Sequence, residues 1–323
     1  MFFSAGVVNY NTEYHCISKT YLVMEARKVE LTQDFFIKNL NVPAVAWPTV
    51  ALLIACWVNH LTVAYLYHTG SITAPQAVIV NSASSFAVFT AMHDAAHKSI
   101  FSEASSARWA NELVGYLSSA LFPAPFLAFK YIHLQHHKHT NDPDNDPDFW
   151  VAVGPTVLLP VRWFSIELKY YAKYLPMIFK GTRPTEEIAS VLLQIVLMIS
   201  AVVMACKHGF GYTVVFAWIL PGRLAMGALA YCFDYLPHRP HRVSRAQSPA
   251  AATCVTSLYS DVTWLLTWPL LHQNYHAIHH FAPHIPFYHY STVWKQLKDE
   301  LVKKGVQINP ILGKAVATGT KVD

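Results

Sequence analysis

Residues 133–137 read His-Leu-Gln-His-His, and residues 276–280 repeat the arrangement as His-Ala-Ile-His-His. On a helix, histidines at positions i, i+3 and i+4 lie on one side, and two adjacent histidines diverge by about 100°. Each segment can therefore offer imidazoles to two metal ions at once. Two copies of this spacing in one chain are hard to obtain by accident, and they indicate a shared metal site.

Two shorter segments carry further histidines. His93 and His97 stand four residues apart, so on a helix their rings lie on one face about 6 Å apart and can reach one metal ion. Residues 236–241 read Leu-Pro-His-Arg-Pro-His and directly follow a long apolar stretch. The pair at 93 and 97 is weak evidence alone, because such pairs arise by chance in a chain with 18 histidines.

The composition indicates a membrane protein. Hydrophobic residues make up 53% of the 323 residues and charged residues only 13%, whereas an ordinary soluble domain has about 25% charged residues. A helix that crosses a bilayer takes about 20 apolar residues. Four stretches meet this requirement: residues 44–67, 72–92, 188–206 and 212–233. The short connections within each pair of stretches predict two helical hairpins.

The distribution of Lys and Arg predicts how these hairpins are oriented. Residues 93–187 carry nine Lys or Arg and the residues after 233 carry nine more, whereas the opposite loops carry only Lys207. The positive-inside rule therefore places the middle segment and both termini in the cytoplasm. All four histidine segments fall on this same side, although the charge argument makes no use of them.

Three interruptions of the apolar pattern need an interpretation. The stretches 113–129 and 255–271 contain prolines or polar breaks, so we expect them at the membrane interface or packed against the bundle. Pro221, Gly222 and Arg223 lie near the middle of the fourth predicted span. We expect a kink there, with the arginine paired inside the bundle.

The ligand set narrows the choice of metal. Imidazole suits several transition metals, but the chain has no H-E-x-x-H helix, no E-x-x-H carboxylate pair and no cysteine cluster. Nine or more imidazoles exceed what one four-coordinate zinc can use, which favours two irons. No basic run is interleaved with aromatic residues, so nucleic acid is not an expected partner. Residues 1–42 also lack a basic region followed by an apolar region, so a cleaved signal peptide is not expected.

The order and spacing of the histidine segments resemble those of the membrane fatty acid desaturase and hydroxylase superfamily. The resemblance covers residues 44–290. Three strings within it, at residues 133–148, 233–241 and 273–280, resemble the cyanobacterial-type β-carotene hydroxylases in particular. The family's ligands would then correspond to His93, His97, His133, His136, His137, His238, His276, His279 and His280.

This resemblance implies an activity and its partners. Members of the superfamily hydroxylate or desaturate an unactivated carbon, with two irons as cofactor and dioxygen as co-substrate. A ferredoxin, a cytochrome or a reductase would supply the electrons. The chain departs from acyl-CoA desaturases in having three residues between His93 and His97 instead of four, and Asp234 where those enzymes place an asparagine.

Several polar residues near the histidine segments are candidates to orient the metal ligands, since metal-bound imidazoles usually donate their second N–H to a partner. These candidates are Asp94, His139, Asp142, Asp148, Asp234, His241 and His272. Asp142 and Asp148 belong to a run of four aspartates that also includes Asp144 and Asp146. A solvated turn is the alternative interpretation of that run.

The predicted architecture is an all-α integral membrane protein, with four transmembrane helices in two hairpins and a cytoplasmic helical cap that holds the two metals. Residues 1–43 form an N-terminal cytoplasmic segment, residues 44–290 the membrane domain and residues 291–323 a cytoplasmic tail. In a bacterium the protein would lie in the inner membrane, with the metal site on the cytoplasmic side.

The leading prediction for the substrate is a carotenoid ring, and the alternative is a fatty acyl chain that is desaturated or hydroxylated. A protein that binds metal in the membrane without catalysis is a third interpretation. Transporters place polar ligands near the bilayer midplane, whereas these histidines lie at one face, so the third interpretation is disfavoured.

Overall fold

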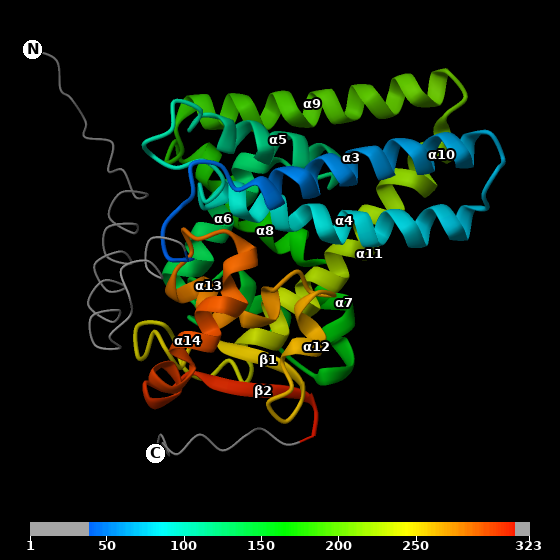
Figure 1. Ribbon diagram of the computed structural model, residues 1–323. Helices are drawn as coiled ribbons and strands as arrows, with labels where there is room; N and C mark the ends of the chain where they lie inside the picture. The colour runs from blue at the N-terminus through cyan, green and yellow to red at the C-terminus, as the bar shows by residue number, and fades with distance from the viewer. Residues whose placement is uncertain (1–38, 314–323) are drawn as a thin grey trace, which may run out of the picture.

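The computed structural model describes residues 39–313, which are mostly helical. The helices α3 (Trp47–His68) and α4 (Ala74–Ala96) form a hairpin, and α9 (Thr185–Lys207) runs in a similar direction above them in Figure 1. The next helical segment changes type along its length. It consists of α10 (Gly211–Val214), the π-helix η3 (Val215–Ile219), α11 (Leu220–Leu229), the π-helix η4 (Ala230–Tyr235) and the 3-10 helix η5 (Leu236–His238).

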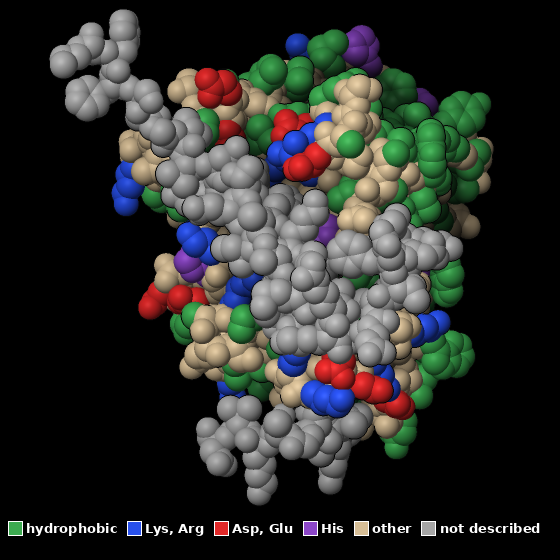
Figure 2. All heavy atoms as spheres, turned by 60° about the vertical axis from the view of Figure 1, so that its left-hand side comes forward, with side chains coloured by type: hydrophobic (Ala, Val, Ile, Leu, Met, Phe, Trp, Pro, Cys, Tyr) green, Lys and Arg blue, Asp and Glu red, His purple; other side chains and the backbone are tan. Residues whose placement is uncertain are grey.

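Three helices within residues 39–313 are long and apolar enough to cross a membrane, namely α3, α9 and the segment from Gly211 to His238. A fourth candidate arises only if the bent pair α5 and α6 counts as one span. Large apolar side chains point outward from these helices; Leu193 and Val196 of α9, for example, are 59% and 57% exposed. Figure 2 shows hydrophobic side chains gathered on the upper right of one face. An apolar solvent is the natural environment for such a surface.

The predicted second span corresponds to α4, which is less apolar than expected. Its buried face carries Asn81, Ser84 and Ser85 because α4 packs in the centre of the bundle, between α3, α5 and α11, instead of facing lipid. Asn81 Nδ2 donates to the carbonyl of Ala217 in the π-helix η3, at 2.6 Å. Thr73 and Gln76 form a capping box that begins α4 after the short turn from α3.

The apolar stretch 113–129 is divided between two helices. The helices α5 (Ala110–Leu121) and α6 (Phe126–His139) meet at an angle of 104°. Pro123 and Pro125 occupy the bend. Proline interrupts a helix because it has no backbone N–H to donate to a helical hydrogen bond. Because of this bend, α6 points away from α5, and its three histidines at 133, 136 and 137 are buried. The segment that follows α6 contains η1 (Asp148–Ala152), η2 (Thr156–Leu158), α7 (Leu159–Trp163) and α8 (Ile166–Phe179).

Arg223 forms the predicted ion pair with a partner on α8, but its side chain is 38% exposed and is not enclosed in the bundle. Arg223 Nη1 lies 2.6 Å from Glu167 Oε1, and Arg223 Nη2 donates to the carbonyl of Phe164. The π-helices η3 and η4 flank the α11 turn that contains Pro221 and Gly222. A Cβ atom added to Gly222 would lie 2.6 Å from Pro123, so glycine allows this helix to approach the bend between α5 and α6.

The remaining elements form a cap, which lies in the lower part of Figure 1. Its elements are β1 (Cys254–Tyr259), α12 (Trp264–Thr267), η6 (Gln273–Tyr275), α13 (His276–Phe281), η7 (Phe287–His289), α14 (Tyr290–Lys303) and β2 (Gln307–Leu312). The strands pair in parallel, with Val255 opposite Ile308, and both residues join the apolar core under α13 and α14. This two-stranded sheet is an addition to the helical fold that the sequence predicts, and it lies partly in the stretch 255–271.

Candidate metal centre

The structure brings the nine predicted ligand histidines together in two adjacent groups. Within each group the candidate ligand nitrogens all lie within 4.8 Å of one another. One group has five members: His93, His97, His133, His137 and His279. The other has four: His136, His238, His276 and His280. All nine side chains are buried. The end of α4, the helix α6, the 3-10 helix η5 and the helix α13 each contribute to this centre.

The repeated spacing explains how two groups arise. From α6, His133 and His137 point into the five-histidine group, whereas His136 points into the four-histidine group. The helix α13 divides its histidines in the same manner, because adjacent residues diverge by about 100°. The Nε2 atoms of His137 and His279 lie 2.7 Å apart, and those of His136 and His280 lie 3.3 Å apart. The segments 133–137 and 276–280 therefore each contribute histidines to both groups.

The nitrogens of this cluster fit metal ions better than they fit one another. A neutral imidazole has a single N–H, so one Nε2 that meets several others cannot share a hydrogen bond with each. His238 is buried, and its ring packs against those of His136, His276 and His280. Burial, followed by the neighbouring imidazoles, holds the pKa values of His137, His279 and His280 well below the usual value. These rings are therefore neutral at pH 7 and offer lone pairs to a metal.

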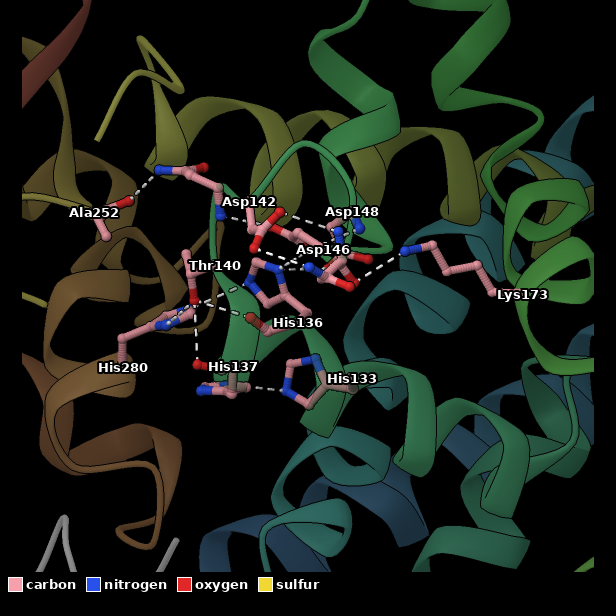
Figure 3. A network of polar contacts seen from close by, with 12 residues as sticks. His133, His136, His137, Thr140, Asp142, Asp146, Asp148, Lys173, Ala252 and His280 are labelled. Atoms are coloured by element: carbon pink, nitrogen blue, oxygen red, sulfur yellow. Dashed lines mark hydrogen bonds and ion pairs between the residues drawn. The ribbon is translucent and has the colours of Figure 1, made fainter. Parts of the chain in front are cut away.

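Two aspartates fix the orientation of His136, as Figure 3 shows. His136 Nδ1 donates to Asp146 Oδ1 at 2.9 Å and lies 3.3 Å from Asp148 Oδ2. Burial alone lowers the pKa of His136, but the two carboxylates raise it to about 9. At pH 7 the metal-free ring is therefore protonated on both nitrogens. The carboxylates hold the Nδ1 proton, so a metal would displace the proton on Nε2, which faces the four-histidine group.

The loop around Asp146 is built to hold that carboxylate in place. The backbone N–H of Asn141 donates to Asp146 Oδ2 at 2.7 Å, and that of Asp148 donates to Oδ1 at 2.9 Å. Asn141 has a φ of 60°, a conformation that asparagine tolerates better than most residues. The hydroxyl of Tyr170 donates to Asp148 Oδ1 at 2.7 Å. Each aspartate therefore has one oxygen near His136 and the other held by a different donor, Asn141 for Asp146 and Tyr170 for Asp148.

Sequence reasoning missed two residues that orient imidazoles. The hydroxyl of Tyr290 lies 3.0 Å from His279 Nδ1, and Thr140 Oγ1 lies 3.5 Å from His280 Nδ1. Thr140 follows directly after α6, so its position three residues after His137 was a weak indication of a role near the histidines. No pattern in the sequence distinguishes Tyr290 from the other tyrosines, because the contact depends on the turn between α13 and α14.

Of the seven candidate orienting residues, only Asp148 forms a hydrogen bond or ion pair with a histidine of the two groups among the contacts in residues 39–313. Asp142 instead accepts from the backbone N–H groups of Asp144 and Asn145, so it stabilises the turn. The orienting role that was expected of Asp142 belongs to Asp146, which accepts a hydrogen bond from His136 Nδ1. His139 is half-buried and belongs to neither group.

The other candidates lie nearby without joining either group. Asp94 is buried and accepts a hydrogen bond from Thr49 Oγ1 at 2.9 Å, which ties α3 to α4. His241 Nε2 lies 3.2 Å from the carbonyl of Tyr235. His272 is buried and packs against Trp268. Asp234 lines a cavity that also reaches the histidines.

We expect Asp146→Asn to weaken metal binding by the four-histidine group about 10- to 100-fold, the usual effect of removing a residue that orients a ligand. Asp142→Asn is the matched control, because it changes the same chemical group in the same loop without touching an imidazole. Titration of metal-depleted protein with Fe²⁺ measures both affinities. Equal affinities in the two variants would contradict the assigned role of Asp146.

An apolar cavity leads to the histidines of both groups. Aromatic and aliphatic side chains form most of its wall, among them Phe89, Phe122, Phe129, Met226 and Phe233. His93 and His133 of one group and His136 and His276 of the other also line it. A long apolar molecule in this cavity would meet both candidate metal positions.

Comparison with known proteins identifies the family. The family description "Fatty acid desaturase" matches residues 69–311, and the chain therefore belongs to the fatty acid desaturase family. The predicted membership of the desaturase and hydroxylase superfamily is thus confirmed.

Curated relatives carry several names. A β-carotene ketolase from Paracoccus sp. (strain PC1) is 28% identical over 208 residues, 63% of this chain and 72% of the ketolase. A fatty acid desaturase from Bacillus subtilis is 23% identical over 222 residues, 62% of this chain and 61% of that protein. An sn-1 acyl-lipid omega-3 desaturase (ferredoxin) from Nostoc sp. (strain 36) is 34% identical over 65 residues, 20% of this chain and 17% of that desaturase.

Together, the family, the apolar helices and the buried histidine groups define a membrane oxidoreductase of the desaturase type with a metal site.

Proposed function

We propose that the protein binds two irons, one in each histidine group, and uses dioxygen to hydroxylate the ring of a carotenoid. The observation that carries the proposal is the apolar cavity whose wall includes histidines of both groups. The substrate would lie in this cavity with one C–H bond facing the metals. Bound irons would supply the activation of dioxygen and the removal of hydrogen from an unactivated carbon.

The protein's own residues prepare the site in three ways. Asp146 and Asp148 hold the proton of His136 on Nδ1, and the Tyr290 hydroxyl oxygen accepts a hydrogen bond from His279 Nδ1, so that both Nε2 atoms would face the metals. The phenylalanines of the cavity exclude water from the reacting carbon. They also restrict how a flat, rigid substrate can turn, which selects the C–H bond that is presented.

The choice of a carotenoid rests on three observations. The strings at residues 236–241 and 273–280 resemble those of β-carotene hydroxylases, and only three residues separate His93 from His97. The name of the Paracoccus relative refers to a carotenoid. The names of the Bacillus and Nostoc relatives favour the alternative, a fatty acyl chain. Both reactions begin with the same hydrogen abstraction, so the metal centre alone does not distinguish them.

The electron donor would be a separate acidic carrier. Arg242, Arg245, Lys303 and Lys304 lie around two adjacent hollows of the cap, and one of these hollows reaches His280. Such a basic surface attracts an acidic protein and speeds its association. The name of the Nostoc relative includes ferredoxin, which is one carrier of this kind.

Expression in a bacterium that accumulates β-carotene, together with a compatible electron donor, tests the substrate. Pigments and fatty acids are analysed from the same cells, with cells that express a His280→Ala variant as the control. We expect new hydroxycarotenoids and an unchanged acyl profile. Unchanged carotene beside a new double bond or hydroxyl in the acyl chains would assign the acyl alternative instead.

The proposed orientation places both termini and the histidine groups in the cytoplasm, because Lys and Arg are concentrated there. We expect an alkaline phosphatase fused after Asp323 to be inactive in a bacterial host and a green fluorescent protein at the same position to be fluorescent. The opposite pair of results would invert the topology.

A further inference from the structure

We propose that Glu167 of α8 binds a neutral hydroxyl group of a long apolar molecule inside the cavity. This proposal adds a polar contact point to the proposed function and rests on it only in taking the cavity as the substrate site. The starting observation is that Glu167 lines the cavity wall, and that its Oε2 atom is buried without a hydrogen-bond partner.

The other oxygen of Glu167 is already used. Arg223 Nη1 lies 2.6 Å from Glu167 Oε1, while Nη2 of the same guanidinium donates to the carbonyl of Phe164. The glutamate side chain is 18% exposed, so water reaches it poorly. A buried acceptor without a donor is unfavourable, and a ligand that brings a donor gains the energy of that bond without displacing another one.

Neighbouring polar groups on the same face of α8 do not supply the missing donor. The hydroxyl of Tyr170 is donated to Asp148 and that of Tyr174 to Glu187. Tyr171, one turn after Glu167, also lines the cavity, but no hydrogen bond joins its hydroxyl to Glu167 Oε2. Much of the remaining wall is aromatic or aliphatic, as at Phe122 and Met226. Glu167 Oε2 therefore remains an acceptor without a donor in the cavity wall, beside Tyr171 and the ion-pair partner Arg223.

The charge balance selects the chemical class of the ligand. Arg223 already neutralises the carboxylate, so an amine cation would add an uncompensated charge in a region of low polarity, which is costly. An ionised carboxylate, such as the head of a free fatty acid, has no hydrogen to donate, so it could not form a hydrogen bond with Glu167 Oε2. A neutral hydroxyl donates one hydrogen bond and adds no charge.

The location also limits which part of the ligand carries the hydroxyl. Glu167 precedes Tyr170 by three residues, which is about one helical turn, or 5 Å, along α8. Tyr170 in turn reaches His136 through Asp148. A hydroxyl at Glu167 would thus hold the molecule at a point separate from the imidazoles, so that an apolar part of it faces the metals.

A binding measurement tests this inference without requiring turnover. The purified full-length protein in lipid nanodiscs is equilibrated with equal amounts of 1-octadecanol and 1-methoxyoctadecane, which both accept hydrogen bonds although only the alcohol donates one. Mass spectrometry of the retained lipids then gives the ratio of alcohol to ether, relative to empty nanodiscs. We expect the wild-type protein to enrich the alcohol about tenfold, the effect of one hydrogen bond to a charged group.

Three variants give the test its controls. Glu167→Leu should abolish the enrichment. Because this change leaves Arg223 without its ion-pair partner, the double variant Glu167→Leu, Arg223→Leu removes both charges and should abolish it as well. Glu186→Leu changes an exposed glutamate outside the cavity and should leave the enrichment intact.

Two results would overturn the inference: a wild-type protein that binds alcohol and ether equally, or enrichment that persists in the double variant. Neither result depends on whether the protein acts on carotenoids or acyl chains. Failure of the hydroxyl site is therefore distinguishable from failure of the proposed function.

Discussion

Replacing His280 with alanine is expected to lower activity on the order of 1,000-fold or more and to empty the four-histidine group of metal. His280 Nε2 lies 3.1 Å from His276 Nε2 and 3.3 Å from His136 Nε2, at the centre of that group. Without His280, only three imidazoles of the four-histidine group remain to bind the metal ion. A metal ion supplies several kcal/mol of transition-state stabilisation, and each 1.36 kcal/mol corresponds to about a tenfold change in rate.

Two comparisons make this result specific. His137→Ala should have a matching effect through the five-histidine group, because His137 Nε2 lies 2.7 Å from His279 Nε2. His139→Ala is the matched control on the same helix, and it should retain metal and at least about half of the activity, since His139 is half-buried and belongs to neither group. Full iron content and full activity in the His280→Ala protein would refute the assignment.

Filling the cavity is expected to abolish turnover while the metal stays bound. Met226 lies on α11 and lines the cavity. Among the described residues, its sulfur has a hydrogen bond with Arg223 and none with a histidine of either group. Met226→Trp places a large ring in the space that the substrate needs, so we expect kcat/KM to fall about 100-fold or more, equivalent to about 3 kcal/mol. Steady-state kinetics and iron content are measured on the same preparation.

The control for this prediction places the same bulk outside the cavity. Leu192 of α9 is 52% exposed on the apolar surface, and Leu192→Trp should leave both kcat/KM and iron content close to those of the wild-type protein. If Met226→Trp kept full activity, the substrate would have to approach the metals by another route, and the cavity would lose its assigned role.

The convergence of the nine histidines could be anticipated because it depends on local geometry. Residues spaced i, i+3 and i+4 must share a helix face, and this rule holds wherever the helix is placed. The structure adds how the histidines are divided. His133 and His137 join one group and His136 the other, which follows from the 100° between adjacent residues together with the bend between α5 and α6.

The residues that orient the histidines could not be identified in the same way. Asp142 and Asp146 lie in one run of aspartates with similar neighbours, and the structure uses only Asp146 for His136. That choice depends on the conformation at Asn141, where a positive φ brings a backbone N–H onto Asp146. The contact of Tyr290 with His279 depends on how α14 folds back over α13.

The fold shows the same division between local and distant effects. The hairpin of α3 and α4 follows from two apolar stretches and a short turn. The pairing of Val255 with Ile308 joins strands more than fifty residues apart, so no local pattern predicts it. The polar face of α4 reflects its central position in the bundle, which depends on all of the helices around it.

The metal content of the wild-type protein tests the central claim most directly. The protein is purified from cells grown with iron and zinc both available, and metals are quantified by inductively coupled plasma mass spectrometry against the protein concentration. Five imidazoles in one group and four in the other predict about two irons per chain. A single zinc per chain, or no stoichiometric metal, would contradict the two-iron centre.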